Sequence, residues 1–527
     1  MASYSVIIRG GRIIDGLGSN KLYQADVGIR GDRIYDIGDL STSRAEIEVD
    51  AANKYVAPGF IDITNHSDTH WTIFDVPRLD SLLLQGITTI IGGNCGSSLA
   101  PLISGEEVEA IKKWVDISNI NISWQSVGEY LDQVEKNKIG VNFGTLVGFG
   151  TLRRGAVRKT DKEADATEIE KMRFLFEEAQ DAGAFGLSTS LGRAHEQAAG
   201  REELAALAEI TVQNGALFKH HLRDEGPNIL PALSEVISLA RESGVRTSIS
   251  HFKILGQSAW PNFNNAVVML EQALKDRLAV SADISPYIKT GSNLYLFLPD
   301  WALSGGRGNI IKNITDQAKR QLILKELAKL TLHYDRIIIS DTLRDSTAIG
   351  KTLADIASST GLAPEEVIIE MLLVNDLQVT IFNEVVHQPH LDALARKFYV
   401  HFASDGFGLD VSHAKQELPH PRSFGAMPKA LNYFVRSRNH LGWEEAIYKM
   451  TGFPAQVAGI KDRGCIMKNY YADITVFDPA SISDKADYSN PLQYPSGINW
   501  VFVNGQIAVR NGQITSGLFG SILRKHK

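Results

Sequence analysis

Cysteine is scarce in this sequence of 527 residues, which contains only Cys95 and Cys465. A disulfide framework in a chain of this length would use more, so we expect a reducing compartment and a cytoplasmic location. Long apolar runs are also missing. The most apolar stretches, such as LLLQGITTIIGG, fall well short of the roughly 20 apolar residues that cross a bilayer. The opening MASYSVIIRGGRIIDG lacks the apolar core of a signal peptide. We therefore expect no membrane association.

An excess of basic residues is absent as well. Lys and Arg number 54 against 61 Asp and Glu, which gives a net charge of -7. Such a surface is not built to neutralise phosphates, so we expect no nucleic-acid partner. Apolar residues make up 44% and charged residues 22%, which is ordinary globular usage and excludes disorder, collagen-like repeats and a long coiled coil. A homo-oligomer is compatible with this composition, and the oligomeric state is left open.

Both ends of the chain have the pattern of antiparallel strands. Residues 4–56 alternate short β-rich runs with Gly and Asp turns, and ADITVFDP and INWVFVNGQIAVRNGQIT repeat this pattern near the C-terminus. We predict one small β domain built from residues 1–56 and 466–527. Two separate β pieces would show the same pattern.

The middle of the chain, residues 57–465, alternates short strands with helices. The helical segments include EADATEIEKMRFLFEEAQDAG and ILPALSEVISLARESG, each followed by a terminating Gly. This alternation indicates βαβ units and a parallel sheet. Eight such strands predict an α/β fold of the TIM-like (β/α)8 barrel type. The eight runs are GFIDI, GITTIIGG, VNFGTLVG, AFGLSTS, ALFKHH, RTSISH, LAVSADI and YVHFASD.

One excursion interrupts this alternation between the seventh and eighth strands. Residues 291–335 are too long for a simple connection and contain the aromatic, Gly-rich GSNLYLFLPDWALSGGRGN. Long insertions in compact domains are often functional, so we predict a lid there. RIIIS at 336–340 and VTIF at 379–382 are further strand candidates outside the count of eight.

Polar side chains follow the predicted barrel strands, at the end where barrel enzymes do their chemistry. Cysteine, histidine and aspartate are ligand types of Zn2+, and three distant ligands with one open position would form a catalytic site. Taken singly, such a Cys is more often a small buried apolar residue and such a His a packing residue. His220 and His221 are adjacent in the sequence. Because side chains alternate along a strand, only one of these two can point into the barrel, and the pattern does not decide which. These residues are His66, Asp68, Cys95, Ser188, His220, His221, His251, Asp283 and Asp405.

These residues lie in motifs that resemble the N-acyl-D-amino-acid deacylase (D-aminoacylase) family of the amidohydrolase superfamily. The resemblance runs nearly end to end, and its most specific motifs are the cysteine loop and the loop that contains HPR. The matching segments are PGFIDITNHSD, GGNCGSS, GAFGLSTSL, HHLRDEG, SISHFKILG, DISPY, ASDG, HPRSFGAMPKAL and TGFPAQVAGIKDRGCIMKNYYADITVFDP. The resemblance implies a barrel with a small β-sandwich built from both termini.

The resemblance also assigns a site. It implies one tightly held zinc bound by Cys95, His221 and His251, choosing His221 over its neighbour because the family's ligand stands two residues before an arginine. It implies that Asp405 shuttles the proton during hydrolysis of an N-acyl-D-amino acid. By similarity, Lys253 and Tyr287 hold the substrate carboxylate or orient the scissile amide.

Two departures from the family pattern change these expectations. The first-strand motif usually has two histidines separated by one residue, and here Thr64 replaces the first, leaving His66. Because that pair belongs to a second, weaker metal position, we expect this position to be weak or absent. His66 is then free to hydrogen-bond the water or the oxyanion. In SLGRAHEQ, where relatives have a Tyr and a Pro-Gly turn, Arg193 supplies a candidate cation for an acidic substrate, or is simply exposed.

Two alternatives remain at this point. A cyclic-amide hydrolase of the hydantoinase or dihydroorotase type would use the complete histidine pair and a carbamylated lysine, and the cysteine at the bridging place disfavours it. A non-catalytic scaffold with the same fold is supported by the missing histidine. The retention of Cys95, His221, His251 and Asp405 together argues against a scaffold.

Overall fold

Parallel strands enclose the centre of the molecule in the computed structural model. Along the chain they are β6 (Phe60–Asp62), β7 (Ile87–Gly92), β8 (Asn142–Thr145), β9 (Val147–Gly148), β10 (Gly186–Ser190), β11 (Leu217–His221), β12 (Arg246–Ile249), β13 (Val280–Ile284) and β17 (Val400–Phe402). The structure describes residues 3–19, 21–103, 117, 120–157, 159, 161–193, 195–303, 306–330, 332–413 and 417–525.

These strands form one closed barrel of eight. β8 and β9 are two halves of the single predicted strand, interrupted at Leu146, whose N–H bonds the carbonyl of Gly92 at 3.0 Å. Two backbone hydrogen bonds join the end of β17 to the end of β6: Asp405 N–H to Thr64 O at 3.0 Å, and His66 N–H to Gly406 O at 2.8 Å. Each of the eight predicted runs therefore contains one barrel strand, and the (β/α)8 prediction is confirmed.

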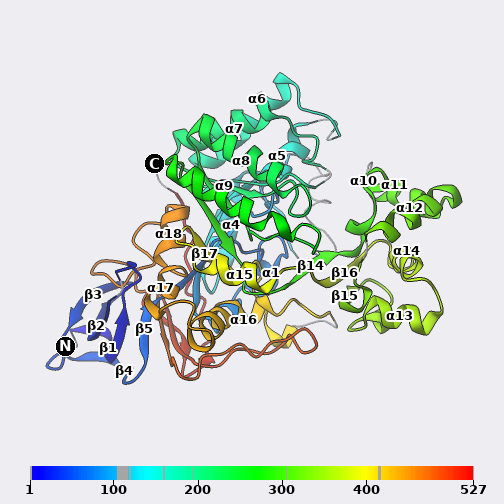
Figure 1. The fold of residues 1–527 in the computed structure, drawn as a ribbon. Helices are drawn as coiled ribbons and strands as arrows, with labels where there is room; N and C mark the ends of the chain where they lie inside the picture. Colours follow the sequence, from blue (N-terminus) through cyan, green and yellow to red (C-terminus); the bar gives the residue numbers. More distant parts are fainter. Residues whose placement is uncertain are drawn as a thin grey trace.

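Helices cover the outside of the barrel (Figure 1). Those between consecutive strands include α5 (Phe149–Ala156), α6 (Ala166–Asp181), α7 (Arg201–Gln213), α8 (Ile229–Ser243) and α9 (Phe263–Lys275). α6 begins with a capping box, in which the Asp165 and Glu168 side chains satisfy each other's backbone N–H groups. α8 ends at Gly244, whose φ of 73° suits glycine. Every residue of β7 is buried, as expected for a strand covered on both faces.

Other helices lie between β6 and β8, just before β17 and after β17 along the chain. They are α1 (Thr72–Asp75), α2 (Asp80–Leu83), α4 (Val127–Asn137), α15 (Gln388–Ala395), α16 (Arg422–Ala430), α17 (Trp443–Tyr448) and α18 (Gly452–Ala458), and α16 continues into a π-helix over Leu431–Ser437. No helix among the described residues combines the length and apolarity needed to cross a membrane.

Strands from both ends of the chain share one sheet. Its order is β21 (Gln513–Ile514), β20 (Gln506–Arg510), β19 (Ile498–Val503), β18 (Ile474–Phe477), β5 (Tyr55–Pro58), β1 (Tyr4–Ile14), β2 (Leu22–Arg30) and β3 (Arg33–Gly38), with β4 (Ala45–Asp50) beside β1. The N- and C-terminal halves meet where β5 and β18 pair antiparallel, with Pro58 opposite Ile474. One β-sandwich domain from both termini is therefore confirmed, while its exact bounds, 1–56 and 466–527, stay a prediction.

The excursion between the seventh and eighth barrel strands belongs to a larger unit with its own core. β14 (Lys289–Asn293), β16 (Val379–Glu384) and β15 (Ile337–Thr342) form a three-stranded antiparallel sheet. α10 (Asp300–Leu303), α11 (Gly306–Thr315), α12 (Gln317–Lys329), α13 (Leu353–Thr360) and α14 (Pro364–Val374) pack against it. This unit projects from the barrel (Figure 1).

The predicted range of the excursion, 291–335, thus contains only part of this unit. RIIIS and VTIF, left outside the barrel count, are its second and third strands along the chain. Residues 304–305 and 331 of the predicted range lie outside the described residues. A role of this unit as a lid stays a prediction.

Candidate metal centre

Three of the predicted side chains converge at the C-terminal mouth of the barrel. The ligand atoms of Cys95, His221 and His251 all lie within 4.8 Å of one another, and no other such cluster was found among the described residues. Cys95 Sγ is 3.4 Å from His251 Nε2. The Nδ1 atom of His221 is buried and has no hydrogen-bond partner. A thiol, two imidazoles and an unused ring nitrogen fit a bound Zn2+.

The backbone is strained at three residues of this mouth. Cys95, His251 and Asp405 have φ angles of 52°, 38° and 55°, in the left-handed region that disfavours side chains. Each such residue costs about 1–3 kcal/mol, and such strain is concentrated at functional sites. Gly93, two residues before Cys95, also has a positive φ, and a Cβ there would collide with the Leu146 carbonyl. These tight turns start the loops that position the three side chains.

Burial and charge set the ionisation of Cys95. Burial raises the pKa of its thiol, but the neighbouring His251 charge and hydrogen bonds from His221, His251 and His66 outweigh burial. The pKa of Cys95 is therefore well below its ordinary value, which favours the thiolate, the form that binds metals. Cys465 differs, because burial followed by the charge of Asp15 raises its pKa to about 11.

A carboxylate that the sequence did not point to holds both histidines. Glu225 Oε1 accepts from His251 Nδ1 at 3.1 Å, and its Oε2 lies 3.6 Å from His221 Nε2. The same Oε1 accepts from Lys253 Nζ at 2.8 Å. Carboxylates bonded to the outer nitrogen of a ligand imidazole fix its tautomer and orientation. The available clue was the position of Glu225 four residues after His221.

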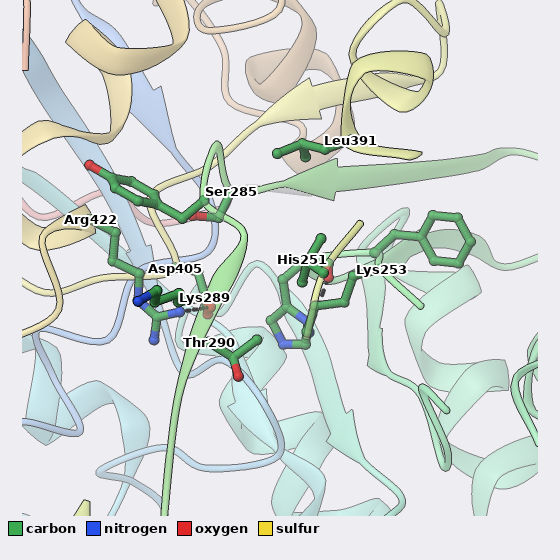
Figure 2. A pocket seen from close by; sticks show the side chains of 11 residues that line it. His251, Lys253, Ser285, Lys289, Thr290, Leu391, Asp405 and Arg422 are labelled. Atoms are coloured by element: carbon green, nitrogen blue, oxygen red, sulfur yellow. Dashed lines mark hydrogen bonds and ion pairs between the residues drawn. The ribbon is translucent and has the colours of Figure 1, made fainter. Parts of the chain in front are cut away.

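Asp405 lies between two basic side chains. His66 Nε2 is 3.2 Å from Asp405 Oδ1, and the Arg422 guanidinium donates to Oδ2 (Figure 2). Burial raises the pKa of Asp405, but Arg422, followed by His251 and His66, outweighs burial and holds this pKa well below its ordinary value. Asp405 is therefore a carboxylate that can accept a proton. Arg422 was not predicted as a site residue, although it lies in the specific HPR motif.

A pocket opens beside this centre. His251, Asp405 and Arg422 line it together with Lys253 and Tyr287, two residues predicted to contact substrate. Its remaining lining comprises Phe252, Ser285, Lys289, Thr290, Val386 and Leu391. Figure 2 shows that the start of β14, the first strand of the projecting unit, forms part of this wall through Lys289 and Thr290.

The three residues predicted to contact substrate differ in their hydrogen bonds and in their position relative to the pocket. Lys253 is tied to Glu225 and also donates to the carbonyl of His251 at 3.2 Å. The Tyr287 hydroxyl donates to the carbonyl of Pro421 at 3.3 Å. Arg193 is exposed in the turn after β10 and is not among the residues that line the pocket.

Sequence comparison relates the chain to known enzymes. D-aminoacylase from Alcaligenes xylosoxydans xylosoxydans is 31% identical over 99% of this chain and 98% of its own length. The chain belongs to the D-aminoacylase family of amidohydrolases. Residues 48–280 also match the model of an amidohydrolase family.

Solved D-aminoacylase-family structures share the fold throughout. N-acyl-D-glutamate deacylase from Bordetella bronchiseptica, complexed with zinc and a phosphonate mimic of the tetrahedral intermediate, has a TM-score of 0.83 at 27% identity, covering 99% of both chains. A D-aminoacylase with a binuclear metal centre has a TM-score of 0.82 at 29% identity, and the match covers 99% of this chain and 100% of that one. In that enzyme one metal ion activates and the second attenuates. Metal ions are thus part of the chemistry of this family.

Proposed function

We propose that this D-aminoacylase-family enzyme hydrolyses the amide bond of N-acyl-D-amino acids, releasing a carboxylic acid and a free D-amino acid. One zinc ion is held by Cys95, His221 and His251. The observation on which the proposal depends is the convergence of these three donors beside the ionised Asp405. That the enzyme works in the cytoplasm, without nucleic acid or membrane, stays a prediction from composition.

The residues around the ion would carry out the proton transfers. When bound, zinc supplies a Lewis acid that lowers the pKa of water toward neutral and polarises a carbonyl oxygen. Asp405 accepts the proton that water loses during attack and then delivers it to the departing nitrogen. His66, at hydrogen-bond distance from Asp405, holds the water or the oxyanion. Arg422 keeps the carboxylate oriented and ionised between turnovers.

The substrate would be held in the pocket beside the ion. Lys253 provides a cation for the substrate carboxylate and is kept in place by Glu225. Tyr287 has a hydroxyl that can donate once it leaves the Pro421 carbonyl. We assign no role to Arg193, because it does not line this pocket.

A substrate panel tests the proposed reaction. Purified enzyme is incubated with paired N-acetyl-D- and N-acetyl-L-amino acids, and the free amine released is measured. We expect release from D substrates only, with dihydrouracil and hydantoin as cyclic-amide controls that are not opened. Hydrolysis of the cyclic amides alone would replace this proposal with the hydantoinase alternative.

The structure disfavours both alternatives. A hydantoinase-type centre needs a lysine among its metal ligands, and the nearest fifth-strand lysine, Lys219, is bonded instead to Thr64, Asp283 and the Ile63 carbonyl. A non-catalytic scaffold has no need for the strained turns that position Cys95 and Asp405.

Glu225→Gln should weaken zinc binding while leaving the three ligands in place. An amide keeps an oxygen acceptor but loses the charge that orients both imidazoles, and such changes cost about 10–100-fold in metal affinity. Competition against a zinc chelator measures this loss. Glu235→Gln is the matched control. Glu235 lies on α8 and pairs with Arg223 at 2.7 Å, so this variant should leave the zinc affinity unchanged. Equal zinc affinities in the two variants would show that Glu225 does not contribute to zinc binding.

A further inference from the structure

A lysine lies inside the barrel beneath the candidate metal centre. Lys219 on β11 is completely buried, and its Nζ has three oxygen partners. It donates to the Ile63 carbonyl at 2.7 Å and to the Thr64 hydroxyl, and it pairs with Asp283 Oδ2 at 3.0 Å. All three N–H groups of the ammonium are thus satisfied, as a buried charge requires.

This ammonium is connected to the candidate metal centre through its hydrogen-bond partners. Lys219 precedes the ligand His221 by two residues, so strand alternation places both side chains on the same side of β11. Its partner Asp283 accepts the backbone N–H of the ligand His251 through Oδ1 at 2.7 Å. The backbone carbonyl of its other partner, Thr64, accepts the N–H of Asp405 at 3.0 Å.

The remaining oxygen atoms around the ammonium are already in use. Thr64 Oγ1 accepts from Lys219 and donates to Asp283 Oδ2 at 2.8 Å. Both oxygens of Asp283 are therefore occupied, one by the lysine and the threonine and the other by a backbone N–H. A metal ion approaching residue 64 would meet the neutral Thr64 hydroxyl, whose hydrogen bonds are already formed. The positive charge of Lys219, next to that hydroxyl, would repel the ion.

We propose that the Lys219 ammonium, with Thr64, prevents a second metal ion from binding at this mouth. The ammonium puts a positive charge next to Thr64, and the chain keeps a mononuclear centre. This inference rests on the proposed function, because it presupposes the ion held by Cys95, His221 and His251. His66, 4.0 Å from Cys95 Sγ, is thereby left to Asp405 and the substrate instead of a second ion.

Metal stoichiometry tests the proposal without relying on activity. Wild type, Thr64→His, Lys219→Ala and the double variant Thr64→His/Lys219→Ala are dialysed against excess Zn2+ and analysed for zinc per chain. We expect about one ion in the first three proteins and about two in the double variant, where an imidazole is added and the ammonium removed. Circular dichroism checks that each variant is folded.

Each outcome decides a separate point. Two ions in wild type or in Thr64→His would overturn the role of Lys219, and so would one ion in a folded double variant. If the double variant does not fold, the triple variant Thr64→His/Lys219→Ala/Asp283→Asn takes its place in the comparison. The triple variant removes both charges of the buried pair, so no unpaired charge is left behind. No zinc in folded wild type would instead refute the proposed function.

Discussion

Replacing Cys95 with alanine should remove both the zinc and the activity. Cys95 is the one sulfur donor of the proposed centre. Its pKa is lowered, which favours the thiolate, and its Sγ lies 3.4 Å from His251 Nε2. Lewis-acid catalysis contributes several kcal/mol, so we expect kcat/KM to fall about 1,000-fold or more. Elemental analysis after dialysis and the release of free amine measure the two losses in one preparation.

Cys465→Ala is the matched control for this experiment. Cys465 is also buried, but its Sγ donates to the Gly16 carbonyl at 3.7 Å, and its raised pKa keeps it a thiol. This variant should retain zinc and activity. Full zinc content and full turnover in Cys95→Ala, with the fold confirmed by circular dichroism, would eliminate Cys95 as a ligand and the proposed centre with it.

Asp405→Asn should separate metal binding from turnover. The asparagine amide keeps the shape of the side chain and its contact with His66, but it cannot accept the proton of water. General acid–base groups contribute about 10²–10⁴-fold, so kcat should fall by that factor while zinc content stays at about one ion per chain. Steady-state kinetics on an N-acetyl-D-amino acid, with zinc analysis of the same sample, makes the measurement.

A distant carboxylate gives the comparison for this variant. Asp276, at the end of α9, pairs with Arg241 at 2.8 Å on the surface, so Asp276→Asn should leave kcat unchanged. Because Asp405→Asn leaves Arg422 without its anionic partner, the thermal midpoint is recorded for both variants. An unchanged kcat in Asp405→Asn would show that another group moves the proton.

The barrel itself could be predicted because its information is local. Each run of β-branched residues followed by an amphipathic helix reports burial on both faces of a parallel strand, and such units close only into a few folds. Terminating glycines such as Gly244 marked helix ends directly in the sequence. The projecting unit was underestimated because β14, β15 and β16 pair across long loops, and sheet register between distant segments leaves no local pattern.

The candidate metal centre could likewise be predicted only in part from the sequence. The sequence by itself placed cysteine, histidine and aspartate side chains after the strands, and the family motifs predicted Cys95, His221 and His251 as the metal ligands. The structure brings the donor atoms of these three residues within 4.8 Å of one another. Only the tertiary structure decided what surrounds them: Glu225 behind both imidazoles, Arg422 on Asp405, and Lys219 beneath the centre. The physical reason is that charge pairing depends on which side chains face one another across different strands and loops, as with Lys219 and Thr64, 155 residues apart in the chain, and these positions are fixed only when the barrel closes.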